Sequence, residues 1–148
     1  MIEVEVFGAR LAPRAPALAE VRRLCTEAAA SAGIDHGHVA IEFVDADRIT
    51  QLNAQHRGQP RPTDVLSFPI DGVEPIGGVV PGYERSPRPD EYSGVLEREL
   101  GDIVICPAHT ADLREAIVHG MLHLLGMDHE TDDGQMLALQ GRLLREAT

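Results

Sequence analysis

The sequence predicts a single α+β domain, residues 1–148, in which helices pack on a small mixed β-sheet. In the first half of the chain, short runs of β-branched and aromatic residues alternate with longer segments of helical periodicity, whereas helical patterns dominate after residue 110. Strands that alternate with helices and then give way to helices are typical of one sheet covered by helices. A chain of 148 residues is also long enough to form one hydrophobic core.

The first strand and the first helix are expected near the N-terminus. Residues 2–7 alternate apolar and charged side chains, which is the pattern of a half-buried strand. A connection punctuated by prolines covers 10–16, and a helix is expected over 17–32 with Gly33 as its stop. The positions of this helix that we expect to face the core are Leu18, Val21, Leu24, Cys25, Ala28 and Ala32.

A second strand and helix then lead to a strand at an edge. We expect a strand over 39–44, followed by a helix that Asp45 caps and that ends near Gly58. Two prolines beyond that glycine exclude regular structure, and the next strand is expected over 64–70. Because proline cannot donate to a sheet ladder, Pro69 marks the limit of this strand or an edge position.

The second half of the chain begins with a long irregular segment. Residues 71–97 contain four prolines and five glycines, and a loop of this length is usually functional or disordered. An apolar strand is expected over 102–106, and the next helix, starting near Thr110 or Asp112, is expected to be central. Thr131 is a suitable cap for a last helix. The expected buried face of that helix consists of Met136, Leu139, Leu143 and Leu144.

The composition predicts an acidic, cytoplasmic protein. The formal net charge is −11, with 13 arginines and no lysine. No apolar run approaches the ~18 residues that a membrane span needs, and residues 1–5 lack the features of a signal peptide. Cys25 and Cys106 lie far apart and form no disulfide framework, so reduced thiols are expected. An acidic chain is not an obvious nucleic-acid binder, because phosphate contacts require a basic surface.

One segment departs from the acidic balance. Residues 49–63 contain no acidic side chain but include His56, Arg57 and Arg61. A guanidinium such as that of Arg57 can contact two phosphate oxygens at once, with Arg61 as an outer contact. On composition alone an ordinary solvated loop is the simpler interpretation, and Arg57 would then complement the dipole at a helix C-terminus.

The strongest functional motif is His-Gly-Met-Leu-His-Leu-Leu-Gly-Met-Asp-His over 119–129. His119 and His123 are four residues apart, so on a helix they lie on the same face. Gly126 can adopt a left-handed conformation and end the helix, which allows the chain to bring His129 beside the first two histidines. Three imidazoles with a fourth position open are the arrangement of a catalytic zinc site, so we expect one Zn²⁺ per chain.

The surroundings of this motif fit a metal site, although other interpretations remain. The helix is apolar nearly all round, as buried helices are, and its histidines could instead be core residues. Asp128 is placed to accept the second N–H of a ligating histidine, or it is a surface aspartate in a turn. Imidazole also suits nickel and cobalt. Zinc lowers the pKa of a bound water to about 7, which leaves hydroxide and a ribose 2′-OH both open as the nucleophile.

Three motifs together follow the order found in one family. Leu52-Asn53 with Arg57-Gly58 leads into Pro-Thr-Asp-Val-Leu-Ser-Phe-Pro over 62–69, Leu-Gly-Asp-Ile-Val-Ile-Cys follows over 100–106, and the histidine motif completes the set. In these motifs the chain resembles the YbeY family of bacterial rRNA maturation endoribonucleases. His56 stands where an aromatic residue is common in that family.

The resemblance implies a zinc-dependent, single-strand-specific endoribonuclease that acts in maturation of the 3′ end of 16S rRNA and in ribosome quality control. It implies that the partners are single-stranded rRNA, the small ribosomal subunit and ribosome-associated proteins, with no membrane. It further implies a zincin-like central helix with His119, His123 and His129 as the zinc ligands and Arg57 as a functional residue. Asp64 and Ser67 lie in the family strand, where they line the cleft or, for Asp64, cap a turn.

Two other functions are compatible with the motif. Metzincin peptidases share the spacing of the three histidines, but their general base is a glutamate directly after the first histidine, and here Gly120 stands at that position. A peptidase would need Asp128 or Glu130 as a substitute. A non-catalytic, zinc-stabilised ribosome-binding module is the second alternative, although structural zinc sites usually have four ligands and favour cysteine.

Overall fold

The computed structural model describes residues 2–70, 99–127 and 133–146, without the side chain of the last residue. The described elements are β1 (Ile2–Phe7), the 3₁₀ helix η1 (Ala9–Leu11), α1 (Leu18–Ser31), β2 (Gly37–Phe43), α2 (Ala46–Arg57), β3 (Val65–Pro69), β4 (Glu99–Ile105), the 3₁₀ helix η3 (Pro107–His109), α3 (Leu113–Leu124) and α4 (Gln135–Glu146). The α+β class and the order of its elements are confirmed. The expected long loop over 71–97 and Thr131, the expected cap, lie outside the described residues.

The sheet is mixed, as predicted. Its four described strands have the order β1-β2-β4-β3. β1, β2 and β4 are parallel, and β3 pairs antiparallel with β4. Pro69 is the last residue of β3, at the edge of the sheet, where a missing N–H breaks no ladder.

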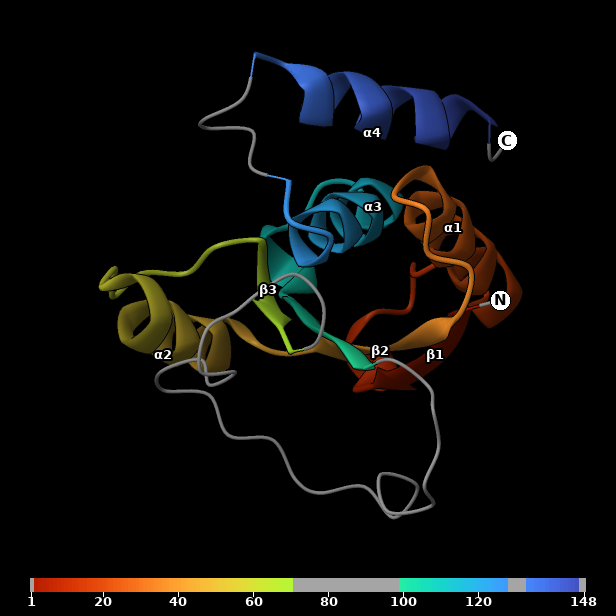
Figure 1. Ribbon diagram of the computed structural model, residues 1–148. Coiled ribbons are helices and arrows are strands. Elements are labelled where there is room, and N and C mark those ends of the chain that lie inside the picture. Colours follow the sequence, from red (N-terminus) through yellow and green to blue (C-terminus); the bar gives the residue numbers. More distant parts are fainter. Residues whose placement is uncertain (1, 71–98, 128–132, 147–148) are drawn as a thin grey trace.

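Helices cover both faces of the sheet, as Figure 1 shows. α1 and α3 lie side by side on one face, and α4 packs outside them. Their apolar side chains form one core with residues of β1, β2 and β4 that include Val39, Ile41 and Ile103. α2 packs on the opposite face, where Ile49 and Leu52 meet Phe68 in a second, smaller cluster.

The element boundaries differ from the expected ones mainly at strand starts. β2 begins at Gly37 rather than at 39, and β4 begins at Glu99 rather than at 102. The early start of β4 requires Gly101, whose φ is +140° and where a Cβ would lie 2.3 Å from the carbonyl oxygen of Phe68. Glycine usually weakens a strand, but at this position it is needed because two backbones approach each other closely.

Two of the expected core positions of α1 are wrong. Leu18 is 47% exposed, and Ala32 is exposed beyond the last helical residue. Val21, Leu24, Cys25 and Ala28 are buried as predicted. The helical stripe therefore holds for the middle turns, whereas both ends of the helix extend past the core on which it packs.

Both cysteines lie in the interior. Cys25 and Cys106 are free and fully buried. Burial raises the pKa of the Cys25 thiol to about 12, which leaves it protonated and unreactive. Among the described helices, none combines the length and the apolar character needed to span a membrane.

Candidate active site

α3 is fixed in the domain from its first turn to its last. Asp112 caps it, because its side chain accepts a hydrogen bond from the backbone N–H of Glu115 (3.2 Å). In the middle of the helix, the Ser67 hydroxyl of β3 donates to the carbonyl oxygen of Gly120 (2.9 Å). The apolar residues Ile117, Val118, Ala116, Met121, Leu122 and Leu124 are buried around it. The expected central, buried helix is confirmed.

His119 and His123 bring their imidazoles together on one face of α3. The two Nε2 atoms lie 3.1 Å apart, and the ring planes are inclined at 73°. Both residues are partly buried. The spacing of four residues thus produces the shared face that the sequence predicts.

The C-terminus of α3 turns back to hold the second histidine. Gly126 has a φ of +95°, as expected for a left-handed helix stop. The backbone N–H groups of Gly126 and Met127 donate to the carbonyls of His123 and Leu122, both at 3.0 Å, which is the hydrogen-bond pattern of a Schellman motif. This turn places the carbonyl oxygen of Met127 3.0 Å from Nδ1 of His123.

The partners of the two rings determine which nitrogen carries the hydrogen. The Met127 carbonyl can only accept, so Nδ1 of His123 donates to it. Nδ1 of His119 likewise donates to Oε1 of Gln140 on α4, at 2.8 Å. In the neutral rings, both lone pairs are therefore on the Nε2 atoms that face each other.

This arrangement fits a metal ion. Two lone pairs repel each other at 3.1 Å unless a metal ion or a shared proton lies between them. Zinc–nitrogen bonds of about 2.0–2.1 Å in tetrahedral geometry separate two ligating nitrogens by about 3.3 Å. Hydrogen bonds from the outer nitrogens to a carbonyl and an amide are the usual support of metal-binding histidines.

The remaining members of the predicted site lie outside the described residues. These are His129, the expected third ligand, and Asp128, the expected outer partner of a ligating histidine. Within 2–70, 99–127 and 133–146, no group of three metal-ligating side chains is found. The three-histidine site and the zincin-like character of the helix stay predictions.

Gly120, directly after the first histidine, is required by packing. A Cβ at this position would lie 2.6 Å from Cγ2 of Ile103 on β4. Position 120 therefore points into the sheet, with no room for a side chain. A glutamate here would clash with the core instead of serving as a base, which removes the main structural requirement of a metzincin peptidase.

We expect Gly120→Ala to destabilise the fold by about 1–3 kcal/mol, the usual cost of overpacking a core. An exposed helical Gly→Ala change normally raises the free energy of unfolding by up to about 1 kcal/mol. A decrease therefore indicates a steric clash at position 120. Gly141→Ala is the matched control, because its Cβ would meet only the flexible Arg145 Nη1 at 3.3 Å. Urea unfolding measures both; equal effects of the two changes would contradict the close contact with Ile103.

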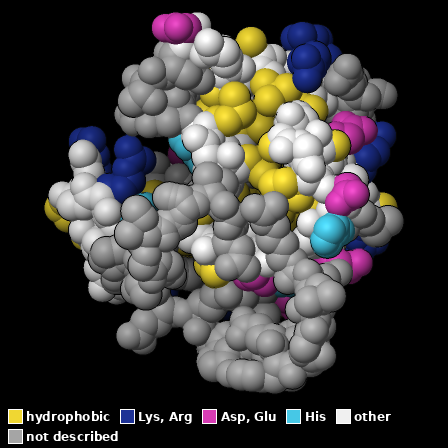
Figure 2. Space-filling model, viewed as in Figure 1, with side chains coloured by type: hydrophobic (Ala, Val, Ile, Leu, Met, Phe, Trp, Pro, Cys, Tyr) yellow, Lys and Arg dark blue, Asp and Glu magenta, His cyan; other side chains and the backbone are white. Residues whose placement is uncertain are grey.

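Arg57 is the last residue of α2 and is exposed. Gly58, with a φ of +71°, ends the helix in the left-handed conformation. A small pocket of ≈130 Å³ follows, lined by Asn53, Arg57, Gln59, Arg61, Pro62 and Thr63. Figure 2 shows arginine side chains gathered at the side of the molecule where α2 lies. The acid-free segment thus forms a basic surface in an acidic chain.

His56 packs its ring against an aromatic side chain. Its ring lies 4.8 Å from that of Phe68, at 52°. Burial and then the neighbouring Arg57 lower the pKa of His56 below its ordinary value. A neutral imidazole that packs on Phe68 fills the role of an aromatic ring.

Asp64 and Ser67, the two expected cleft residues of the family strand, have structural contacts. Asp64 is exposed, and its carboxylate accepts from the Val65 N–H (2.8 Å) while its carbonyl accepts from the Cys106 N–H (2.9 Å). The hydroxyl of Ser67 donates its hydrogen bond to the carbonyl oxygen of Gly120. Contact of either with RNA stays a prediction.

Comparison with known proteins agrees with the motifs. A family model described as Endoribonuclease YbeY matches residues 13–148. The chain belongs to the YbeY family. Proteins named Endoribonuclease YbeY from Nocardia farcinica and Brevibacillus brevis are 38% and 34% identical over 122 and 160 residues. The matches cover 73% and 99% of this chain, and 60% and 97% of those relatives.

A third YbeY relative, from Rubrobacter xylanophilus, is 35% identical over 93% of this chain and 86% of its own length. The fold is similar to the solution structure of TM1509 from Thermotoga maritima, with a TM-score of 0.51 and 27% identity. That match covers 99% of this chain and 89% of the other. The fold similarity therefore extends over nearly the whole chain of this YbeY family member.

Gln140 is a site residue that the sequence analysis missed. It lies on α4, 8% exposed, on the same stripe as the buried Met136 and Leu143. A polar residue on an apolar helix stripe is an available signal, because buried polar groups need a partner. Its partner is the Nδ1–H of His119.

Proposed function

We propose that this YbeY family member is a metal-dependent endoribonuclease that cleaves single-stranded RNA. The observation that carries the proposal is the pair of Nε2 atoms 3.1 Å apart on α3, each on a ring whose other nitrogen is held by an acceptor. His119, His123 and His129 would hold the metal, with zinc as the best match to three imidazoles and an open position. By family resemblance, the substrate is the 3′ end of 16S rRNA in the cytoplasm, at the small ribosomal subunit.

Residues of two surfaces would contribute to the reaction, the histidine site and the basic segment that contains Arg57. The metal, when bound, supplies Lewis-acid polarisation of a phosphate oxygen and an acidified water. Gln140 and the Met127 carbonyl fix the orientation and tautomer of the two described histidines. Arg57 offers a planar fork of N–H donors to the phosphate oxygens that gain charge during cleavage. The segment 49–63 contains two arginines and no acidic residue, and it provides local positive charge in an acidic chain.

The proposal is tested with purified protein that carries no histidine tag. It is incubated with a single-stranded RNA, the same RNA as a duplex, and casein, each with and without a chelator. We expect internal cleavage of the single strand alone, loss of cleavage with chelator, and recovery on addition of zinc. Chelator-sensitive cleavage of casein without RNA cleavage would overturn the proposal in favour of a peptidase.

The ends of the RNA products identify the nucleophile. Attack by the ribose 2′-OH breaks the bond to the 5′ oxygen and leaves a 2′,3′-cyclic phosphate and a 5′-OH. Attack by water leaves a linear phosphate on one product and a hydroxyl on the other. Mass spectrometry of the products separates these outcomes, and neither depends on how the RNA is bound elsewhere.

A further inference from the structure

We infer that the pocket after α2 holds one phosphate of the RNA strand, with Arg57 and Arg61 as its ligands and Asn53 as the residue that positions them. The inference rests on the proposed function, because it assumes an RNA substrate. It adds a defined binding subsite and gives a role to Asn53.

The lining of the pocket suits an anion. Two of its side chains are guanidinium groups, the others are neutral, and no carboxylate lines it. Asp64 follows directly after, but its Oδ1 already accepts from the Val65 N–H (2.8 Å) and the Thr63 hydroxyl (3.3 Å). A volume of ≈130 Å³ has room for a phosphate group and a few waters, whereas a nucleotide needs a larger cavity.

Asn53 holds the two arginines in a fixed relation. Its side-chain Nδ2 donates to the carbonyl oxygen of Arg61 (2.8 Å), and its own carbonyl accepts from the backbone N–H of Gln59 (3.3 Å). The segment that carries Arg61 is thereby tied at two points to the helix that ends with Arg57. Two prolines, Pro60 and Pro62, further restrict this segment. A binding site ordered in advance loses less entropy when its ligand arrives.

The side-chain oxygen of Asn53 is a buried acceptor that receives no hydrogen bond in the described part of the chain. The residue as a whole is 4% exposed. A buried acceptor without a partner is destabilising, so its presence requires an explanation. Arg57, Gln59 and Arg61, whose side chains carry N–H donors, line the same pocket. We expect Oδ1 of Asn53 to accept a hydrogen bond from one of these residues when the phosphate is bound.

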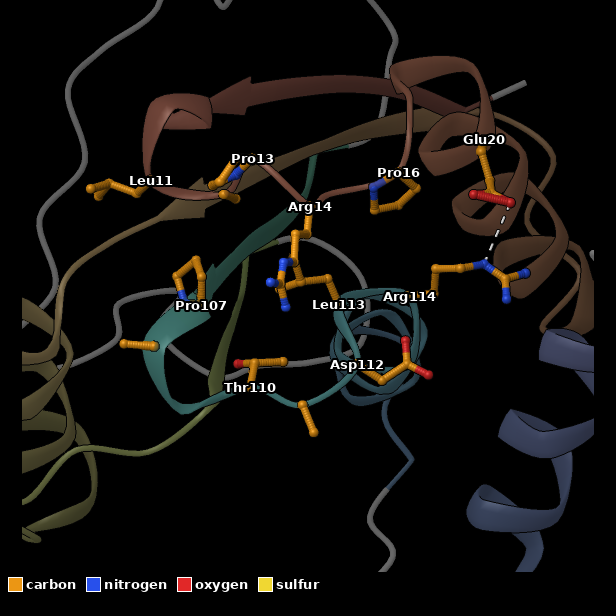
Figure 3. Close-up of a pocket in the computed structure, with 13 residues that line it drawn as sticks. Leu11, Pro13, Arg14, Pro16, Glu20, Pro107, Thr110, Asp112, Leu113 and Arg114 are labelled. Atoms are coloured by element: carbon orange, nitrogen blue, oxygen red, sulfur yellow. Dashed lines mark ion pairs between the residues drawn. The ribbon is translucent and has the colours of Figure 1, made fainter.

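A larger pocket among the described residues lacks this charge asymmetry. Figure 3 shows it between the segment after η1 and the start of α3, and its volume is ≈680 Å³. Arg14 and Arg114 line it, but so do Glu20 and Asp112. Glu20 pairs with Arg114, with 3.4 Å between Oε1 and Nε. Size alone therefore does not indicate the phosphate site, whereas unbalanced positive charge does.

The inference is tested by the salt dependence of RNA binding. Binding of a short labelled 2′-fluoro RNA to the metal-loaded full chain is measured by fluorescence anisotropy at several salt concentrations, and gels confirm that the RNA stays intact. For single strands, each neutralised phosphate contributes about 0.7 to the slope of log Kd against log salt concentration. We expect Arg61→Ala to lower the slope, and Arg57→Ala with Arg61→Ala together to lower it by about 0.7.

A loss of about 1.4 in the double variant would mean two phosphates and no shared pocket, and an unchanged slope would mean no phosphate there at all. Either result overturns the inference. Arg48→Ala is the matched control, because Arg48 is an exposed arginine on the same helix but outside the pocket lining. Its slope is expected to equal that of the parent protein.

The positioning role of Asn53 has its own readout. We expect Asn53→Ala to lower the salt slope, and adding Arg61→Ala to it to lower the slope no further, because both changes disable one contact. A purely structural residue would lower the melting temperature and leave the slope of the folded protein unchanged. If Asn53→Ala does not fold, the two arginine variants still decide whether the pocket binds phosphate.

The same samples separate this inference from the proposed function. Metal-dependent RNA cleavage combined with an unchanged slope in the double arginine variant would refute the pocket and leave the endoribonuclease proposal standing. Absence of RNA cleavage at every metal condition would refute the proposed function. A slope change without cleavage would then identify an RNA-binding protein.

Discussion

Replacing His119 or His123 by alanine is expected to release the metal and abolish RNA cleavage. Each substitution removes one of two nitrogens that meet 3.1 Å apart. A metal that binds only the folded state adds stability by mass action, so the melting temperature of the variants should fall to that of the metal-free parent. Metal content by elemental analysis and melting with and without added zinc measure the effect.

Gln140 allows a graded version of this experiment. Gln140→Leu keeps the side-chain volume roughly constant but removes the acceptor for Nδ1 of His119. Loss of such an outer partner typically weakens metal binding by about 10–100-fold, less than loss of a ligand. His36→Ala is the control, because His36 is an exposed histidine that lies far from the pair in sequence and contacts Asp35. Stoichiometric metal in the His123→Ala protein would show that the histidine pair is not a binding site.

His129 extends the test to the third predicted ligand. His129→Ala should also lower metal occupancy, because a site with two nitrogens binds zinc much more weakly than a site with three. A full equivalent of tightly bound metal in that variant would refute the three-histidine model and leave a site formed by the α3 pair with some other ligand.

The local part of the site was predictable from the sequence. The spacing of His119 and His123 fixes a shared helix face, and Gly126 fixes where the helix turns back, because both depend on residues within one or two turns. Asp45 was predicted as a helix cap for the same reason, and its side chain accepts the backbone N–H of Arg48. Asp112 was one of two expected starts of α3, and its side chain caps that helix. Such features depend on backbone geometry and need no knowledge of the rest of the fold.

The parts of the site that depend on tertiary packing were not predictable. Gln140 reaches His119 from another helix, and Ser67 reaches the Gly120 carbonyl from a strand 53 positions earlier. The sequence showed that Gly120 cannot act as a base, but the reason for a glycine lies in its contact with Ile103. The two strand starts were missed because pairing with neighbouring strands overrides the weak strand preference of glycine.

Replacing Arg57 by alanine is expected to reduce RNA cleavage by about 10²–10³-fold, the usual cost of losing one donor to a developing oxyanion. The residue is exposed at the end of α2, so the change should leave the fold and the metal content intact. Arg57→Lys should recover only part of the rate, because lysine restores the charge but not the planar pair of donors. Single-turnover cleavage of a single-stranded RNA measures all three proteins.

Arg57 also has a purely structural interpretation, since an arginine in the last turn complements the helix dipole. That role contributes about 0.3–1 kcal/mol to stability and nothing to the rate, so melting temperature and cleavage rate separate the two. Arg48→Ala, on the same helix at its other end, controls for loss of one positive charge from an acidic protein. If Arg57→Ala cleaves RNA at the rate of the parent while Arg48→Ala does the same, Arg57 is a helix-end charge and the catalytic assignment is wrong.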